Sequence, residues 1–166
     1  MSKIIEFIKK TPKAELHLHI EGTLEPDHLF KLAKRNNIQI PFANVGEIKS
    51  AYNFSNLESF LKIFYQGSKV LIKEQDFFDL TWAYILKSKK DNVVHTEIFF
   101  DPQTHVNRGV NFDVVINGIY KALLKANKEF GLTFKIIMCF LRHLDEESAF
   151  EILDHALVHK DKIVGV

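Results

Sequence analysis

Short apolar runs alternate with longer helical patterns along this chain of 166 residues. The runs are rich in β-branched and aromatic residues, which is typical of buried strands. These predicted strands cover Ala14–Ile20, Val93–Phe100, Thr133–Leu141 and Lys162–Val166. The longer segments repeat apolar residues at helical spacing, and they cover Pro26–Arg35, Asn56–Ile72, Gln75–Lys89, Phe112–Phe130 and Asp145–Leu157. Strands that alternate with helices predict βαβ units and a parallel sheet.

The spacing of the predicted strands indicates the kind of sheet they form. The later units have the roughly 30 residues of one unit in a (β/α)8 barrel. About 70 residues separate the first two strands, which predicts a helical insertion after the first strand. Loops that follow barrel strands build the active-site face, so this insertion is expected to cap a pocket. The alternative is that its helices only pack outside the sheet.

Four strands do not close a barrel, because removing the free edges takes a full ring of strands. The chain therefore forms either a four-stranded open α/β sheet or part of a larger fold. We expect the second: residues 1–166 are a partial domain, about four β/α units that make the N-terminal half of a (β/α)8 TIM-type barrel, with the C-terminal half absent. The open apolar edge also predicts self-association.

The first predicted strand contains His17-Leu18-His19 near its end. Alternate residues of a strand share a face, so both imidazoles are expected to point the same way, together with Glu15 and Glu21. The intervening apolar residues face the other way. Two neutral imidazoles at close range are suitable ligands for Zn²⁺. A chance pair is the alternative, because the chain contains eight His.

Composition argues against several classes of partner. The 46% hydrophobic content and fifteen Phe are enough for a sizeable core. The net charge of +1, without a basic stripe, argues against nucleic acid. No apolar run approaches the roughly 20 residues that span a bilayer, so no membrane partner is expected. Glu6 interrupts what would be the apolar region of a signal peptide, and the single Cys139 fits a reducing compartment, so we expect a cytoplasmic protein.

Four stretches resemble the adenosine/adenine deaminase family of metal-dependent aminohydrolases. The first is Thr11–Pro26, which contains the two His and continues Glu-Gly-Thr-Leu-Glu-Pro. The others are Phe54–Tyr84, Glu97–His105 with Arg108-Gly109, and Phe140–Leu144. Within the third, Phe-Phe-Asp-Pro-Gln-Thr-His is similar to the adenine deaminase branch rather than to adenosine deaminases proper.

This resemblance implies a (β/α)8 barrel with one Zn²⁺ at its carboxyl face, and a hydrolytic deamination of adenine to hypoxanthine and ammonia in purine salvage. His17 and His19 match the first two metal ligands. In adenosine deaminases the residue that matches Glu21 is typically an Asp that contacts the ribose. The longer Glu21 would intrude where a sugar sits, which favours a free base as substrate; its alternative role is to accept hydrogen bonds near the metal.

Two further candidates for the substrate pocket are His105 and Arg142, because each follows the carboxyl end of a predicted strand. Arg142 has an alternative role as the ion-pair partner of Glu97 inside the sheet. The other histidines are expected elsewhere: His95 in the core of the sheet, and the helical His28, His155 and His159 at the surface.

The resemblance also implies that the third metal His, the catalytic Glu, the His that orients water and the metal-binding Asp come from later strands. No catalytic residue is therefore assigned within this chain, and we expect the chain alone to bind Zn²⁺ weakly and not to deaminate adenine. The alternatives are a deaminase of adenosine or another 6-aminopurine nucleoside, a non-catalytic fragment or pseudoenzyme that self-associates, and a phosphoesterase that begins with the same His pair.

Overall fold

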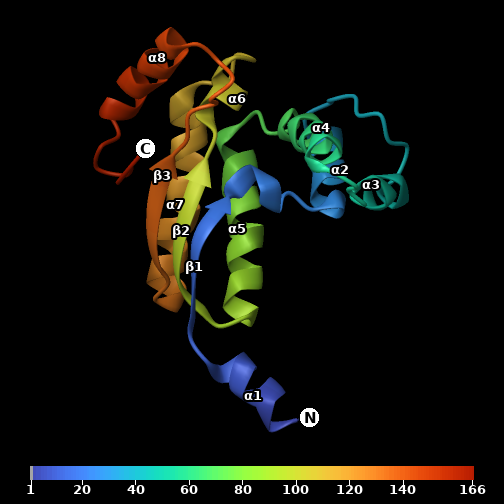
Figure 1. The fold of residues 1–166 in the computed structure, drawn as a ribbon, viewed down its shortest axis with the longest axis vertical. Coiled ribbons are helices and arrows are strands. Elements are labelled where there is room, and N and C mark those ends of the chain that lie inside the picture. The colour runs from blue at the N-terminus through green and yellow to red at the C-terminus, as the bar shows by residue number, and fades with distance from the viewer. Residues whose placement is uncertain (1) are drawn as a thin grey trace.

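The computed structural model describes residues 2–166, and a three-stranded parallel sheet lies at its centre (Figure 1). The strands are β1 (Lys13–His19), β2 (Val93–Phe100) and β3 (Thr133–Met138), and they lie in the order β1-β2-β3. Every pairing is parallel, so each connection crosses over through helices. The parallel α/β fold predicted from the sequence is confirmed.

Helices occupy the segments between and around the strands (Figure 1). They are α1 (Lys3–Lys10), the 3₁₀ helix η1 (Ile20–Thr23), α2 (Pro26–Arg35), α3 (Val45–Ala51), α4 (Leu57–Ser68), α5 (Glu74–Lys90), α6 (Pro102–Val106), α7 (Phe112–Phe130) and α8 (Glu146–Leu157). The pattern predicted α2 and α7 with these bounds. It missed α1, α3 and α6, which have only five to eight residues and too few turns for a helical period to show.

The hydrophobic core lies on one face of the sheet. Thr96, Ile98 and Phe100 of β2 point to this face and are fully buried, as are Ile136 and Met138 of β3. Helices α5 and α7 pack against each other and cover the same face (Figure 1). The opposite face is only half-buried, so it offers polar side chains of the strands to solvent.

The fourth predicted strand, Lys162–Val166, forms only a single bridge. Gly165 bridges to Ile137 of β3 in parallel orientation. The N–H of Val164 donates to the carbonyl oxygen of Ile136 (2.9 Å), and the N–H of Met138 donates to that of Gly165 (3.0 Å). The preceding turns after α8 bring one residue of this segment into register, which is too few for a strand. Residues 2–166 therefore form three strands and one bridge where four strands were expected. Self-association through an open edge stays a prediction.

A β-bulge interrupts the alternation of β1. Glu15 pairs with Thr96 and Leu18 pairs with Ile98, so three residues of β1 advance against two of β2. Glu15 consequently lies on the buried side of the sheet with Thr96, and the prediction that it shares the face of the two imidazoles is wrong. The bulge also leaves Leu16 56% exposed, although the alternating pattern placed it on the apolar face.

The long insertion after β1 folds as helices α2, α3 and α4, which lie together beside the carboxyl end of β1 (Figure 1). A buried carboxylate ties this cap to α5. Asp76 is fully buried and accepts hydrogen bonds from the backbone N–H groups of Ile72 (2.9 Å) and Lys73 (2.8 Å) and from Asn36 Nδ2 (2.7 Å). Arg35 of α2 forms an ion pair with the same carboxylate.

Among residues 2–166, no helix combines the length and the apolar character that a membrane span requires.

Helices α5 and α7 approach closely at Gly118. A Cβ at this position would lie 2.5 Å from the carbonyl oxygen of Glu74 and 2.6 Å from Cβ of Phe77. We expect Gly118→Ala to lower the free energy of unfolding by about 1–3 kcal/mol, because the added methyl overpacks against backbone. Chemical denaturation measures this change. Gly165→Ala is the control, since that glycine has no atom within 4 Å of such a Cβ; a stabilised Gly118→Ala variant would contradict the close contact.

The network around Asp76 predicts a loss of stability in acid. Burial raises the pKa of Asp76, but the hydrogen bonds from Lys73, Ile72, Arg35 and Asn36 outweigh it, so the pKa lies below the usual value of 3.8. The stabilisation is therefore complete above that value and is lost as the pH falls through the lowered pKa. We expect Asp76→Asn to lower the free energy of unfolding at pH 7 by roughly 1–3 kcal/mol. Equal stabilities of the variant and the parent at pH 7 would show that the network contributes nothing.

Candidate metal and substrate site

The carboxyl ends of β1 and β2 meet at one level of the sheet. His19, the last residue of β1, pairs with Phe99 of β2. Asp101 follows two residues later and is buried, and its Oδ2 lies 3.1 Å from Nδ1 of His19. The parallel register therefore places a carboxylate beside the second imidazole of the His-x-His sequence.

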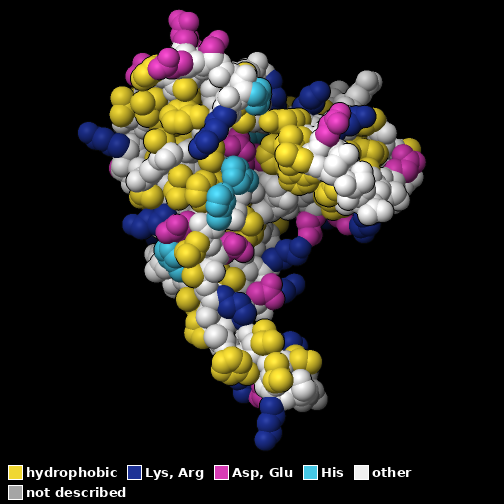
Figure 2. Space-filling view, in the orientation of Figure 1, with side chains coloured by type: hydrophobic (Ala, Val, Ile, Leu, Met, Phe, Trp, Pro, Cys, Tyr) yellow, Lys and Arg dark blue, Asp and Glu magenta, His cyan; other side chains and the backbone are white. Residues whose placement is uncertain are grey.

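The two imidazoles and one aromatic ring form a stack on the half-buried face of the sheet. The ring centroids of His17 and His19 lie 5.7 Å apart at an interplanar angle of 28°. Phe99 lies 4.4 Å from the His17 ring and 5.6 Å from the His19 ring. His17 is exposed and His19 is half-buried. Figure 2 shows histidine side chains gathered over the strands on the face in view. The pair is thus accessible from solvent.

Asp101 determines how His19 can act. Its hydrogen bond is the main cause that raises the pKa of His19 above 6.5; burial lowers this pKa, and the charges of Asp101 and Glu21 raise it further. The carboxylate accepts from Nδ1–H, which leaves Nε2 free for a cation. A carboxylate that orients a ligating imidazole in this way is common at zinc sites. The two imidazoles are therefore donors of the kind that zinc binds, and Nε2 is the His19 nitrogen that the hydrogen bond to Asp101 does not use.

His19, Asp101 and Cys139 also place three ligand atoms within 4.8 Å of one another. This cluster would need the Cys139 thiolate, because the thiolate is the form that binds metal. In the metal-free chain, burial and the nearby carboxylates of Asp101 and Glu21 raise the pKa of this thiol to about 12. A metal would therefore have to displace the thiol proton, whereas a neutral imidazole binds Zn²⁺ without losing one.

Glu21 lies in η1, directly after the strand, and its side chain is fully buried. Its Oε1 accepts the backbone N–H of Asp101 (3.0 Å) and lies 3.1 Å from Nε2 of His105. Its Oε2 is buried and has no hydrogen-bond partner among residues 2–166. A buried acceptor without a donor costs free energy, so this oxygen is a candidate contact for a bound ligand.

A small pocket lies beside Glu21, between η1 and the cap. Aromatic side chains from α4 and the segment before it line this aromatic pocket together with Leu24 and Ile63; they are Tyr52, Phe54, Phe60 and Phe64. Flat aromatic walls with one carboxylate suit a planar heterocycle that carries an N–H group. The predicted capping role of the insertion agrees with this position of α4.

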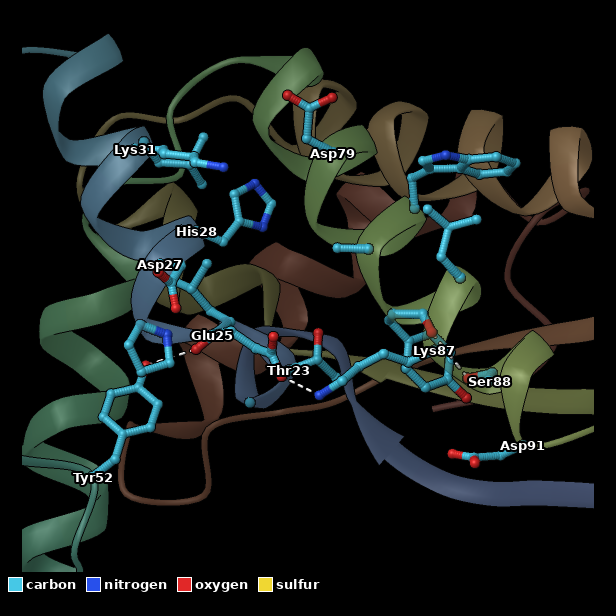
Figure 3. Close-up of a pocket in the computed structure, with 18 of the residues that line it drawn as sticks. Thr23, Glu25, Asp27, His28, Lys31, Tyr52, Asp79, Lys87, Ser88 and Asp91 are labelled. Carbon is cyan, nitrogen blue, oxygen red and sulfur yellow. Dashed lines mark hydrogen bonds and ion pairs between the residues drawn. The ribbon is translucent and has the colours of Figure 1, made fainter. Parts of the chain in front are cut away.

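A larger cavity of about 880 Å³ lies elsewhere, between α2 and α5 (Figure 3). Lys31 and Asp79 reach toward it from these two helices, and Lys87 forms an ion pair with Glu25 at its border. Neither imidazole of the His-x-His sequence lines it. We therefore do not assign the candidate chemistry to this cavity.

The other predicted site residues lie in different surroundings. His105 is fully buried in α6 and reaches the pocket only through Glu21. Arg142 lies exposed in the turn after β3. The carboxylate of Glu97, its suggested partner, instead lies 3.6 Å from His95.

Of the three helical histidines that the pattern placed at the surface, His155 is exposed and His28 is half-buried. His159 is buried, and its Nε2 lies 2.6 Å from Oδ1 of Asp113. The expectation of a surface position is therefore wrong for His159, because the turn after α8 folds back onto the first turn of α7.

Comparison with known proteins assigns the family. The family model described as adenosine deaminase matches residues 12–166. The chain belongs to the adenosine deaminase family. An adenine deaminase of Psychrobacter cryohalolentis is 60% identical over 163 residues, which are 98% of this chain and 49% of that protein. An adenine deaminase of Vibrio parahaemolyticus is 59% identical over 96% of this chain and 48% of its own length.

Solved structures share the fold. The crystal structure of adenine deaminase from Arthrobacter aurescens is 44% identical, with a TM-score of 0.88 over 92% of this chain and 46% of its own. An amidohydrolase of Burkholderia ambifaria, solved with bound Zn, is 24% identical with a TM-score of 0.83 over 96% of this chain and 44% of its own. The chain thus has the fold of the N-terminal half of a (β/α)8 barrel, and it spans about half the length of the relatives it matches.

Sequence reasoning did not assign two residues, Asp101 and Arg108, to this family site. Asp101 contacts both His19 and Glu21, and Arg108 contacts His105 from behind at 2.8 Å. Both lie within the stretch that carries the resemblance: Asp101 comes directly after β2, and Arg108 comes two residues after α6. Their partners lie about 80 residues earlier or one helical turn away, so only the folded chain reveals the contacts.

We expect Asp101→Asn to weaken the candidate metal site without removing a ligand. The amide no longer attracts the proton of His19, so the pKa of His19 falls toward 6.5 in the metal-free protein, which NMR titration measures. Zinc affinity, measured by competition with a chelating dye, falls by about 10–100-fold. The control Asp113→Asn alters the remote pair with His159. Unchanged zinc affinity in Asp101→Asn would contradict the orienting role.

Proposed function

We propose that the protein to which this chain belongs is a zinc-dependent adenine deaminase, which hydrolyses adenine to hypoxanthine and ammonia in cytoplasmic purine salvage. Three features of the chain support this function. His17 and His19 stand at the carboxyl end of β1, the aromatic pocket lies beside Glu21, and the relatives of highest identity reported above carry the name adenine deaminase. The chain contributes two metal ligands and one wall of the pocket.

His17 and His19 would hold a zinc ion, which would activate water for the hydrolysis by lowering its pKa toward neutrality. The residues of this chain prepare the site. Asp101 holds the His19 ring so that Nε2 faces outward, and Phe99 packs beside both rings. Two protein ligands fall short of the three that a catalytic zinc usually has, so we propose that this chain alone binds the ion weakly.

The unpaired Oε2 of Glu21 is the observation that most favours adenine over its nucleosides. Free adenine carries an imidazole N–H, and this N–H is replaced by a bond to ribose in adenosine. A fully buried acceptor gains a hydrogen bond from the base, whereas a nucleoside leaves it unpaired. Sites that lose a buried hydrogen bond discriminate strongly against the analogue that lacks the donor.

We expect Glu21→Asp to change the substrate preference of the polypeptide encoded by the complete gene. The side chain of Asp is one methylene shorter, so its carboxylate lies farther from the base and kcat/KM for adenine falls by roughly 10–100-fold. The ratio of kcat/KM for adenosine to that for adenine therefore rises. Loss of ultraviolet absorbance measures both substrates. Glu58→Asp, at an exposed position of α4, is the matched control. A preference for adenosine in the parent enzyme would favour the nucleoside deaminase instead.

We also expect the purified 166-residue chain to show no adenine turnover with zinc present, because it supplies two metal ligands and no catalytic residue. The chain and the polypeptide from the complete gene are assayed side by side. Robust turnover by the 166-residue chain would contradict the assignment of the remaining site residues to segments outside it.

A further inference from the structure

A buried hydrogen-bonded chain leads from α6 to Glu21. The side chains of His105 and Glu21 are both fully buried, and Nε2 of His105 lies 3.1 Å from Oε1 of Glu21. On the other side of the ring, Nη2 of Arg108 lies 2.8 Å from Nδ1 of His105. A guanidinium only donates, so Nδ1 accepts and the ring proton sits on Nε2. His105 therefore donates to Glu21, in a tautomer that Arg108 imposes.

The same guanidinium is anchored to the cap. Arg108 donates to the carbonyl oxygen of Leu71 and, at 3.4 Å, to that of Lys69, in the segment that joins α4 to α5. The edge of the Phe77 ring packs against His105 with ring centroids 4.9 Å apart. Arg108 thus connects the segment after α4, the helix that lines the aromatic pocket, with His105, which donates to Glu21.

The two carboxylate oxygens of Glu21 differ in the hydrogen bonds that they accept. Oε1 receives both available donors, the backbone N–H of Asp101 and Nε2–H of His105. Oε2 receives none from the described residues and is equally buried. Two donors on one oxygen fix the rotation of the carboxylate, so the second oxygen keeps one direction, in a residue that lines the aromatic pocket.

We propose that Arg108 and His105 are positioning residues that select free purine bases, by locking Glu21 so that only Oε2 is open to the N–H of the substrate. This role rests on the adenine deaminase function proposed above. Without the hydrogen bond from His105, the carboxylate rotates and accepts from its neighbours with either oxygen. The preference for a substrate with an imidazole N–H is then lost.

The test compares adenine with 9-methyladenine, which lacks the imidazole N–H, as substrates of the polypeptide encoded by the complete gene. Both are measured on one preparation, so the ratio of their kcat/KM values does not depend on the folded fraction. We expect Arg108→Met and His105→Phe each to lower this ratio by roughly tenfold or more. Most of this change is an increase in KM for adenine, because Arg108 and His105 act on binding of the base.

Conservative variants separate positioning from general damage. Arg108→Lys keeps a cationic donor for Nδ1, and His105→Gln keeps an N–H donor for Glu21, so both are expected to retain most of the ratio. These conservative variants also provide a measurement if Arg108→Met or His105→Phe does not fold. The control Asn107→Ala changes an exposed neighbour and leaves the ratio unchanged.

The outcomes distinguish the two proposals. A ratio that falls in Glu21→Gln but stays at the parent value in Arg108→Met and His105→Phe overturns the positioning role and leaves the adenine deaminase function standing. A parent enzyme that deaminates adenine and 9-methyladenine equally well overturns the selection of free bases by Glu21, and the positioning role with it. A parent enzyme that deaminates neither overturns the adenine deaminase function. Equal losses in Arg108→Lys and Arg108→Met contradict the hydrogen bond to Nδ1 as the cause.

Discussion

The parallel pairing of β1 with β2 is the constraint on which the site depends. It sets His19 level with Phe99, so the residues that follow the two strands meet at one edge of the sheet. Asp101 then reaches His19 through its side chain and Glu21 through its backbone N–H. A shift of this register by one residue would send the imidazoles to the buried face and separate the two carboxylates from their donors.

Burial gives the polar groups at this edge their specificity. A carboxylate that leaves water must recover its hydrogen bonds from the protein, and Glu21 recovers them on one oxygen only. The cost is tolerated where a ligand can supply the missing donor. Asp76 makes the contrast clear, because its buried carboxylate is satisfied by backbone and side-chain donors and holds the cap in place. Within one chain, a saturated buried carboxylate is structural and an unsaturated one marks a pocket.

Much of the fold and part of the site could be predicted from the sequence. Long amphipathic helices such as Phe112–Phe130 and apolar strands show their period directly, and Gly131 after that helix adopts the left-handed backbone (φ 70°) expected of a C-cap. The β-bulge in β1 turns Glu15 away from the imidazoles, and the alternation of apolar and polar residues does not predict it. The bond between Asp101 and His19 joins positions far apart in the chain, so residue types alone did not reveal it.

The most direct test of the central claim is the position of zinc in a crystal of this protein, located by anomalous scattering at the zinc edge. An orienting role for Asp101 predicts an anomalous peak at the Nε2 atoms of His17 and His19, with the Nδ1 hydrogen bond of His19 intact. A peak among Nδ1 of His19, Asp101 and the Cys139 sulfur would contradict it, since the carboxylate would then be a ligand and the imidazole pair would not.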